Sequence, residues 1–115
     1  MVKRKISDCQ TYAAPGHFDM TAMRIHGKEE SGADKFWMGM SHFLPGGGAD
    51  WDYEESPTSK VYFVLEGELT VTDKDGNKIV VGPMESIHIA PFEGRAIKNE
   101  TNMPLSMLVV VNYPE

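Results

Sequence analysis

The feature that most constrains this chain is the spacing of its turn residues. Glycine, proline and Asp-Gly turns divide the sequence into short segments, and the segments recur about every 8 to 12 residues, as in a β-sandwich or β-barrel. No segment shows the period of an amphipathic helix. With 115 residues, the chain is predicted to form a single domain over 1–115, with an N-terminal arm and strand over 1–35 and a barrel core over 36–111.

The stretch from Pro45 to Gly67 contains the strongest strand signal. A glycine turn leads into an acidic segment over 50–59, and residues 61–65 are rich in β-branched and aromatic side chains. Gly67 ends this strand, and residues 69–72 are predicted to turn back on it as a hairpin. A second hairpin turn is predicted at Asp73–Asn77, because Asp-Gly and Gly-Asn favour positive φ.

Residues 36–44 are predicted to form another strand, which Pro45 would end. The even positions of this strand are the more apolar, so we expect them to face inward: Phe36, Met38, Met40, His42 and Leu44. Trp37 and Phe43 would then face outward. The apolar run over 107–111 is predicted to be a strand buried on both faces.

Composition excludes several functional classes. The net charge is −6, and the one basic cluster is Lys3-Arg4-Lys5, so we expect no nucleic-acid partner. The absence of an apolar run of about 18 residues predicts no membrane span, and no apolar stretch follows the basic cluster as in a signal peptide. The single Cys9 fits a reducing compartment, so a cytoplasmic location is expected.

The order of these signals resembles the cupin superfamily. Pro45-Gly46-Gly47, the segment Val64–Leu69, the Gly76-Asn77 and Gly82-Pro83 turns, and a strand ending before Asn99 occur in the order typical of that family. The resemblance covers about residues 36–111. It implies an all-β fold, the double-stranded jelly-roll β-barrel.

The resemblance also implies a metal site with three histidines and one glutamate. In this sequence the four positions fall on Tyr53, Glu55, Lys60 and Arg95. Lysine and arginine offer only donors and do not ligate a divalent cation at neutral pH. No cofactor is therefore predicted at the usual place, and shifting the count by one residue, to Glu54 and Ser56, restores no histidine.

The altered positions predict a different kind of polar site. If Lys60 and Arg95 point into the barrel, they can bind a small anionic molecule, with the guanidinium pairing bidentately with a carboxylate. Tyr53, Tyr62 and Met40 are the other predicted ligand-binding residues. Glu55 and His42 are the candidate catalytic residues, as a general base and a proton shuttle.

The sequence leaves other interpretations open. Lys60 and Glu55 could form an internal ion pair that performs no chemistry, which would make the domain structural or regulatory. The protein could be an isomerase or lyase that works by proton transfer. It could also be a metal-dependent oxygenase with a displaced site, in which His42 joins Glu54, Glu55 or Asp52 to hold a transition metal.

A homodimer is the expected assembly. Edge strands of a small barrel must be covered or paired, and closed two-fold dimers are the commonest oligomers. The apolar residues expected on the surface, Trp37 and Phe43, and the terminal run over 107–111 support this expectation. Small cupins are usually dimers as well, so the resemblance points the same way.

Overall fold

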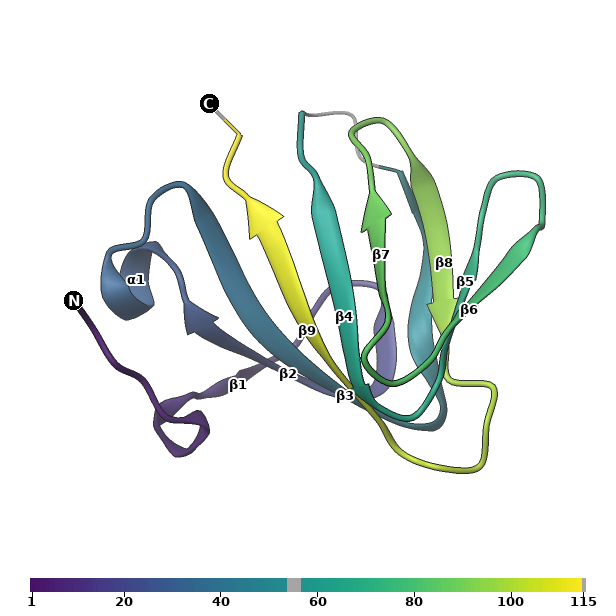
Figure 1. The fold of residues 1–115 in the computed structure, drawn as a ribbon, viewed down its shortest axis with the longest axis horizontal. Coiled ribbons are helices and arrows are strands. Elements are labelled where there is room, and N and C mark those ends of the chain that lie inside the picture. The colour runs from purple at the N-terminus through teal and green to yellow at the C-terminus, as the bar shows by residue number, and fades with distance from the viewer. Residues whose placement is uncertain (54–56, 115) are drawn as a thin grey trace.

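The computed structural model describes residues 1–53 and 57–114, and antiparallel strands dominate it (Figure 1). The strands form a strongly bent sheet that rolls into a nearly closed barrel, so the predicted all-β jelly-roll class is confirmed. No helix in the described part of the chain is long and apolar enough to cross a membrane. The elements are a 3-10 helix (Ile6–Asp8), β1 (Thr11–Tyr12), β2 (His17–His26), α1 (Lys28–Ser31), β3 (Phe36–Tyr53), β4 (Lys60–Glu66), β5 (Leu69–Thr72), β6 (Lys78–Val81), β7 (Ser86–Ile89), β8 (Gly94–Lys98) and β9 (Leu105–Asn112).

Strand β3 connects the two halves of the barrel. The strand order is β6-β5-β8-β3-β9-β4-β7, and β2 pairs with β3 while carrying β1. The first half of β3 pairs with β2 and β9, and its second half pairs with β8. The prediction that Pro45 ends this strand is wrong. A Cβ atom at Gly47 or Gly48 would collide with a backbone carbonyl oxygen of a neighbouring strand, so these glycines allow close strand approach.

The predicted hairpin between residues 61–65 and 69–72 is wrong. Strand β4 pairs with β7 and β9, and β5 pairs with β6 and β8. Gly67, with φ of 86°, carries the chain across the barrel between them. Two apolar strands joined by a short turn show the same local sequence pattern whether they pair with each other or with other strands. The prediction failed because the partners of β4, which are β7 and β9, are distant in sequence. The second predicted hairpin, β5–β6, is confirmed.

The inner face of β3 is the opposite of the predicted one. Gly39, Ser41 and Phe43 are buried, and their register partners on β9 are the buried residues of that strand. Phe36 and Leu44 are 46% and 61% exposed. The more apolar face of β3 was predicted to be internal, but the internal face carries the small residues Gly39 and Ser41. The methionines Met38 and Met40 lie on the outer face, where they are half-buried. The expected inward position of His42 and outward position of Phe43 are both wrong.

The packed core occupies one half of the barrel interior. Strand β9 lies between β3 and β4, and its buried residues alternate with half-buried ones. The prediction that residues 107–111 are buried on both faces is therefore wrong, because only one face belongs to the core. Asn99 is fully buried beside this core, and its amide donates to the carbonyl oxygens of Phe43, Leu44 and Met103. The most deeply buried side chains are Phe43, Val64, Leu69, Leu105, Met107 and Asn99.

Candidate functional site

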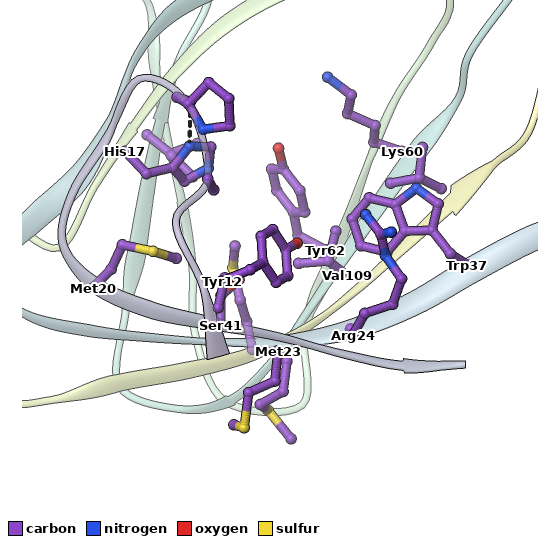
Figure 2. A pocket seen from close by; sticks show the side chains of 18 of the residues that line it. Tyr12, His17, Met20, Met23, Arg24, Trp37, Ser41, Lys60, Tyr62 and Val109 are labelled. Carbon is purple, nitrogen blue, oxygen red and sulfur yellow. Dashed lines mark hydrogen bonds between the residues drawn. The ribbon is translucent and has the colours of Figure 1, made fainter. Parts of the chain in front are cut away.

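The other half of the barrel interior holds a pocket of about 310 Å³ (Figure 2). This volume is at the lower end of the range for small-molecule sites. The pocket lies between the inner face of the sheet and the N-terminal segment that includes Tyr12, Pro15 and His17. The polar or aromatic side chains of its lining are Tyr12, His17, Arg24, Trp37, Ser41, Asp52, Lys60, Tyr62 and Arg95.

Strand alternation places two polar residues of β4 in the pocket. Lys60, Tyr62 and Val64 share the inner face of β4, because their partners on β9 are Val111, Val109 and Met107. Tyr62 is 3% exposed, and the side chain of Lys60 is 16% exposed. In Figure 2 the Tyr62 hydroxyl and the Lys60 ammonium group both point into the open part of the pocket.

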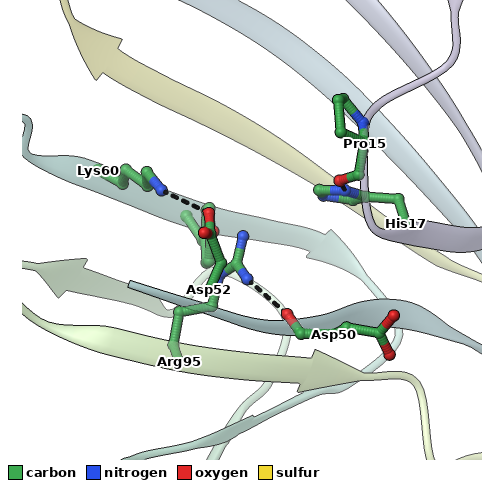
Figure 3. Close-up of polar contacts among 7 residues, drawn as sticks. Pro15, His17, Asp50, Asp52, Lys60 and Arg95 are labelled. Atoms are coloured by element: carbon green, nitrogen blue, oxygen red, sulfur yellow. Dashed lines mark hydrogen bonds and ion pairs between the residues drawn. The ribbon is translucent and has the colours of Figure 1, made fainter. Parts of the chain in front are cut away.

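Arg95 on β8 is the most deeply buried charged residue of the pocket, at 5% exposure. Its Nε donates to the Tyr62 hydroxyl at 3.0 Å. Its Nη1 donates to the Asp50 carbonyl oxygen at 3.1 Å (Figure 3). Among the residues that the structure describes, no carboxylate forms an ion pair with this guanidinium. The hydrogen bonds of Arg95 to described residues are therefore made to neutral oxygen atoms.

Asp52 takes the inward position that sequence counting gave to Tyr53. Two residues lie between Ala49 and Asp52 along β3, but only one lies between their partners Ile97 and Arg95 on β8, so a β-bulge inserts one residue here. Asp52 is paired with Arg95 in the sheet register and lies 3.8 Å from Lys60, measured from Oδ2 to Nζ. Tyr53 is 49% exposed and does not line the pocket.

The two other predicted residues that the structure describes, His42 and Met40, border different cavities. His42 lies on the outer face, where its Nδ1 is 2.8 Å from Ser106 Oγ, and it borders a separate cavity of about 220 Å³. Met40 borders the main pocket, but it shares a face with its partner Met23, which points away from Tyr62 in Figure 2. Glu55, with Glu54 and Ser56, lies outside the described residues.

Several lining residues were missed by the sequence analysis, and His17 and Arg24 are two of them. The Nδ1 of His17 lies 2.8 Å from the Pro15 carbonyl oxygen. A carbonyl only accepts, so Nδ1 carries a hydrogen and the Nε2 of the neutral ring is left as an acceptor. The guanidinium of Arg24 lies over the Trp37 ring, 4.6 Å from its centroid. Strict alternation over residues 17–26 would place His17 and Arg24 on opposite faces, and the irregularity between Phe18 and Met20 is what brings both to the pocket.

The pocket residues do not fit the metal site that the cupin resemblance implies. Two of the expected ligand positions carry the cations Lys60 and Arg95, which cannot ligate a metal. Over residues 1–53 and 57–114, no group of three or more His, Cys, Asp or Glu side chains could hold a metal ion. The displaced site is not assembled from His42 and Asp52, because these residues border different cavities.

Comparison with known proteins gives two informative relatives. A protein named beta-D-galactosidase Rv1717, from Mycobacterium tuberculosis (strain ATCC 25618 / H37Rv), is 40% identical over 112 residues, which are 96% of this chain and 92% of the relative. The structure of the polyketide cyclase RemF from Streptomyces resistomycificus matches with a TM-score of 0.84 at 25% identity and covers 97% of this chain and 80% of that one.

A third similarity concerns the fold alone. The structure of a sugar phosphate isomerase from a cupin superfamily of Silicibacter pomeroyi DSS-3 matches with a TM-score of 0.79 at 18% identity. It covers 97% of this chain and 76% of that chain. The family described as the cupin domain matches residues 39–111, from the inner face of β3 to the end of the core run of β9. On this evidence, the chain belongs to the cupin domain family.

Proposed function

We propose that the barrel pocket binds a small anionic molecule, in the simplest case a carboxylate. The observation that carries the proposal is Arg95, a guanidinium that is 5% exposed and has no ion-pair partner among the described residues. Buried charges in proteins are normally paired. A ligand carboxylate could occupy the free edge of Arg95 with two parallel hydrogen bonds.

Lys60 and Tyr62 support the same proposal. The Lys60–Asp52 ion pair is long, at 3.8 Å, and the Asp52 side chain is 59% exposed, so solvent screens the pair. Lys60 could therefore add a second positive charge to an anion bound by Arg95. Because the Tyr62 hydroxyl accepts from Arg95 Nε, its own hydrogen remains free to donate to a ligand oxygen.

Calorimetric titration with a panel of carboxylates tests this proposal. We expect saturable binding that raises Tm, and a loss of affinity of at least about tenfold in Arg95→Gln, since hydrogen bonds to charged groups contribute roughly 1.5–3 kcal/mol. The matched control is Lys78→Gln, which removes a cation that is 57% exposed and paired with Glu100, away from the pocket. Absence of binding by every carboxylate, or equal affinities in both variants, would contradict the proposal.

Hydrolysis of a β-D-galactoside is the second candidate function. The observation that favours it is the 40% identity to the protein named beta-D-galactosidase, over 96% of this chain. Glycoside hydrolysis usually needs two carboxyl groups flanking the scissile bond. Asp52 supplies a carboxylate in the pocket lining, so it would be the first residue to examine.

A chromogenic β-D-galactoside gives a direct test of the second candidate. We expect Asp52→Asn to lower kcat by about 10²-fold or more, as for the loss of a general acid or base. The control is Asp75→Asn in the exposed β5–β6 turn, which should retain wild-type activity. Wild-type protein without turnover, or Asp52→Asn with full activity, would refute this candidate.

The expected homodimer remains a proposal, with a revised surface. Apolar residues of β3, β9 and β4 lie in register on the outer face of the sheet and could meet a second copy across a two-fold axis. Analytical ultracentrifugation should find a dimer, and Leu108→Lys should yield monomers; a wild-type monomer would contradict the proposal. The proposed surface consists of Met38, Met40, Val61, Phe63, Leu108 and Val110.

A further inference from the structure

We infer that the ligand of the barrel pocket is a sugar acid, a hexuronate whose carboxylate lies on Arg95 and Lys60. This inference rests on the proposed anion-binding function and narrows it to one class of molecule. Three properties of the pocket carry it: an excess of positive charge, acceptors that match hydroxyl groups, and a volume suited to one ring.

The charge of the pocket is opposite to that of the protein. The chain has a net charge of −6, but three cations, Arg24, Lys60 and Arg95, line the pocket together with one described carboxylate, Asp52. Arg24 is held against the Trp37 ring, whereas Lys60 and Arg95 both lie beside Tyr62 on the inner face. The position for an anion is therefore next to Tyr62.

Acceptor groups make the pocket unsuitable for a purely apolar acid. Asp52 contributes a carboxylate, His17 contributes Nε2 because its Nδ1 is bound to Pro15, and Ser41 contributes a hydroxyl on the inner face of β3. An aliphatic or aromatic acid would shield these groups from water without offering them donors, which costs binding free energy. The hydroxyl groups of a sugar can donate to them.

The size and walls of the pocket suit a single pyranose ring. A volume of 310 Å³ corresponds to roughly ten water molecules at about 30 Å³ each. The Tyr62 ring and Val109 form an apolar floor, and Figure 2 shows His17 and Lys60 on opposite sides of the Tyr62 hydroxyl. A ring above this floor would present its carboxylate to the cations and its hydroxyl groups to His17 and Asp52.

The experiment compares D-galacturonate with D-galactose, which differ only in having a carboxylate or a hydroxymethyl group. Calorimetric titration of the full chain should show galacturonate binding at least about tenfold more tightly than galactose, consistent with a charge-assisted hydrogen bond. Galacturonate should also bind more tightly than benzoate and than galactose 6-phosphate. Arg95→Gln should abolish the preference for galacturonate over galactose, and Lys78→Gln should retain it.

A second variant tests recognition of the hydroxyl groups. His17→Phe keeps a ring but removes the acceptor, so it should weaken galacturonate binding at least about fivefold and leave benzoate binding unchanged. Equal affinities of wild-type protein for galacturonate and galactose would overturn the inference. So would tighter binding of benzoate or of the sugar phosphate, although the proposed anion site would then stand. If no anion binds at all, the proposed function itself fails.

Discussion

The two halves of the barrel interior are built from the same strands but differ in what fills them. Along the inner face of β4, the side chains change from Lys60 to Tyr62 to Val64, and β3 changes from Gly39 to Phe43. At the Val64 end the side chains are almost completely buried and pack closely, whereas the Lys60 end leaves a cavity lined by cations. One set of strands therefore surrounds both a packed core and an open pocket.

The difference suggests a division between stability and function. Apolar packing of the side chains around Val64 stabilises the barrel. The buried charge of Arg95 has no ion-pair partner among residues 1–53 and 57–114, so we expect it to contribute little to folding, since burying a cation costs desolvation free energy. Substitutions in the core half should change unfolding, and substitutions in the pocket half should change binding.

The largest expected effect is that of Phe43→Ala in the core half. Phe43 is 2% exposed, and removing a buried phenylalanine side chain costs about 3–5 kcal/mol in free energy of unfolding. Urea denaturation measures this loss. Trp37→Ala in the pocket half is the comparison, and a half-buried side chain there should cost less than about 2 kcal/mol. Equal losses would contradict the division.

Asn99→Ala should produce the next largest effect. The Asn99 amide donates to three backbone carbonyl oxygens, and its Oδ1 accepts from the backbone N–H and hydroxyl of Thr101. Losing this buried network should lower the free energy of unfolding by about 2–4 kcal/mol. The exposed Asn102→Ala serves as the control, with an expected change below about 0.5 kcal/mol. A similar small change for Asn99→Ala would refute the prediction.

Arg95→Met is the sharpest test of the pocket half. Methionine fills similar space without a charge, so the free energy of unfolding without ligand should stay within about 1 kcal/mol of wild type or increase. Carboxylate binding should be lost. Denaturation and calorimetry measure the two properties separately. Destabilisation above about 3 kcal/mol would instead identify Arg95 as part of an internal structural network.

The smallest expected effect is in the β5–β6 turn, outside both halves. Backbone N–H groups of Asn77 and then Asp75 hold the pKa of Asp73 below its ordinary value. The pKa is lower in the folded protein, so this stabilisation is present above the unfolded-state pKa and disappears as the pH falls through the folded-state pKa. Asp73→Ala should lower Tm slightly at neutral pH, and the difference should vanish in acid. A difference that persists in acid would contradict this.

Several features could be predicted from local sequence because local forces produce them. The β5–β6 hairpin follows from its Asp-Gly-Asn turn, and the all-β class follows from the spacing of turn residues. The inward positions of Lys60 and Arg95 agree with positions counted from the family pattern. Counting from the family pattern gave Tyr53 where the structure has Asp52. The cause is a β-bulge, which inserts one residue, reverses the alternation of side chains and has no reliable signature in the local sequence.

The sequence by itself determined the strands, their turns and the presence of cations where the family usually has metal ligands. Only the tertiary structure decided which strands pair, which face of β3 is internal and that His17 joins Asp52 at the pocket. The physical reason is that alternation of side chains specifies two faces but not which face is buried. That choice depends on contacts between strands far apart in the chain, such as β3 with β9 and β4 with β7.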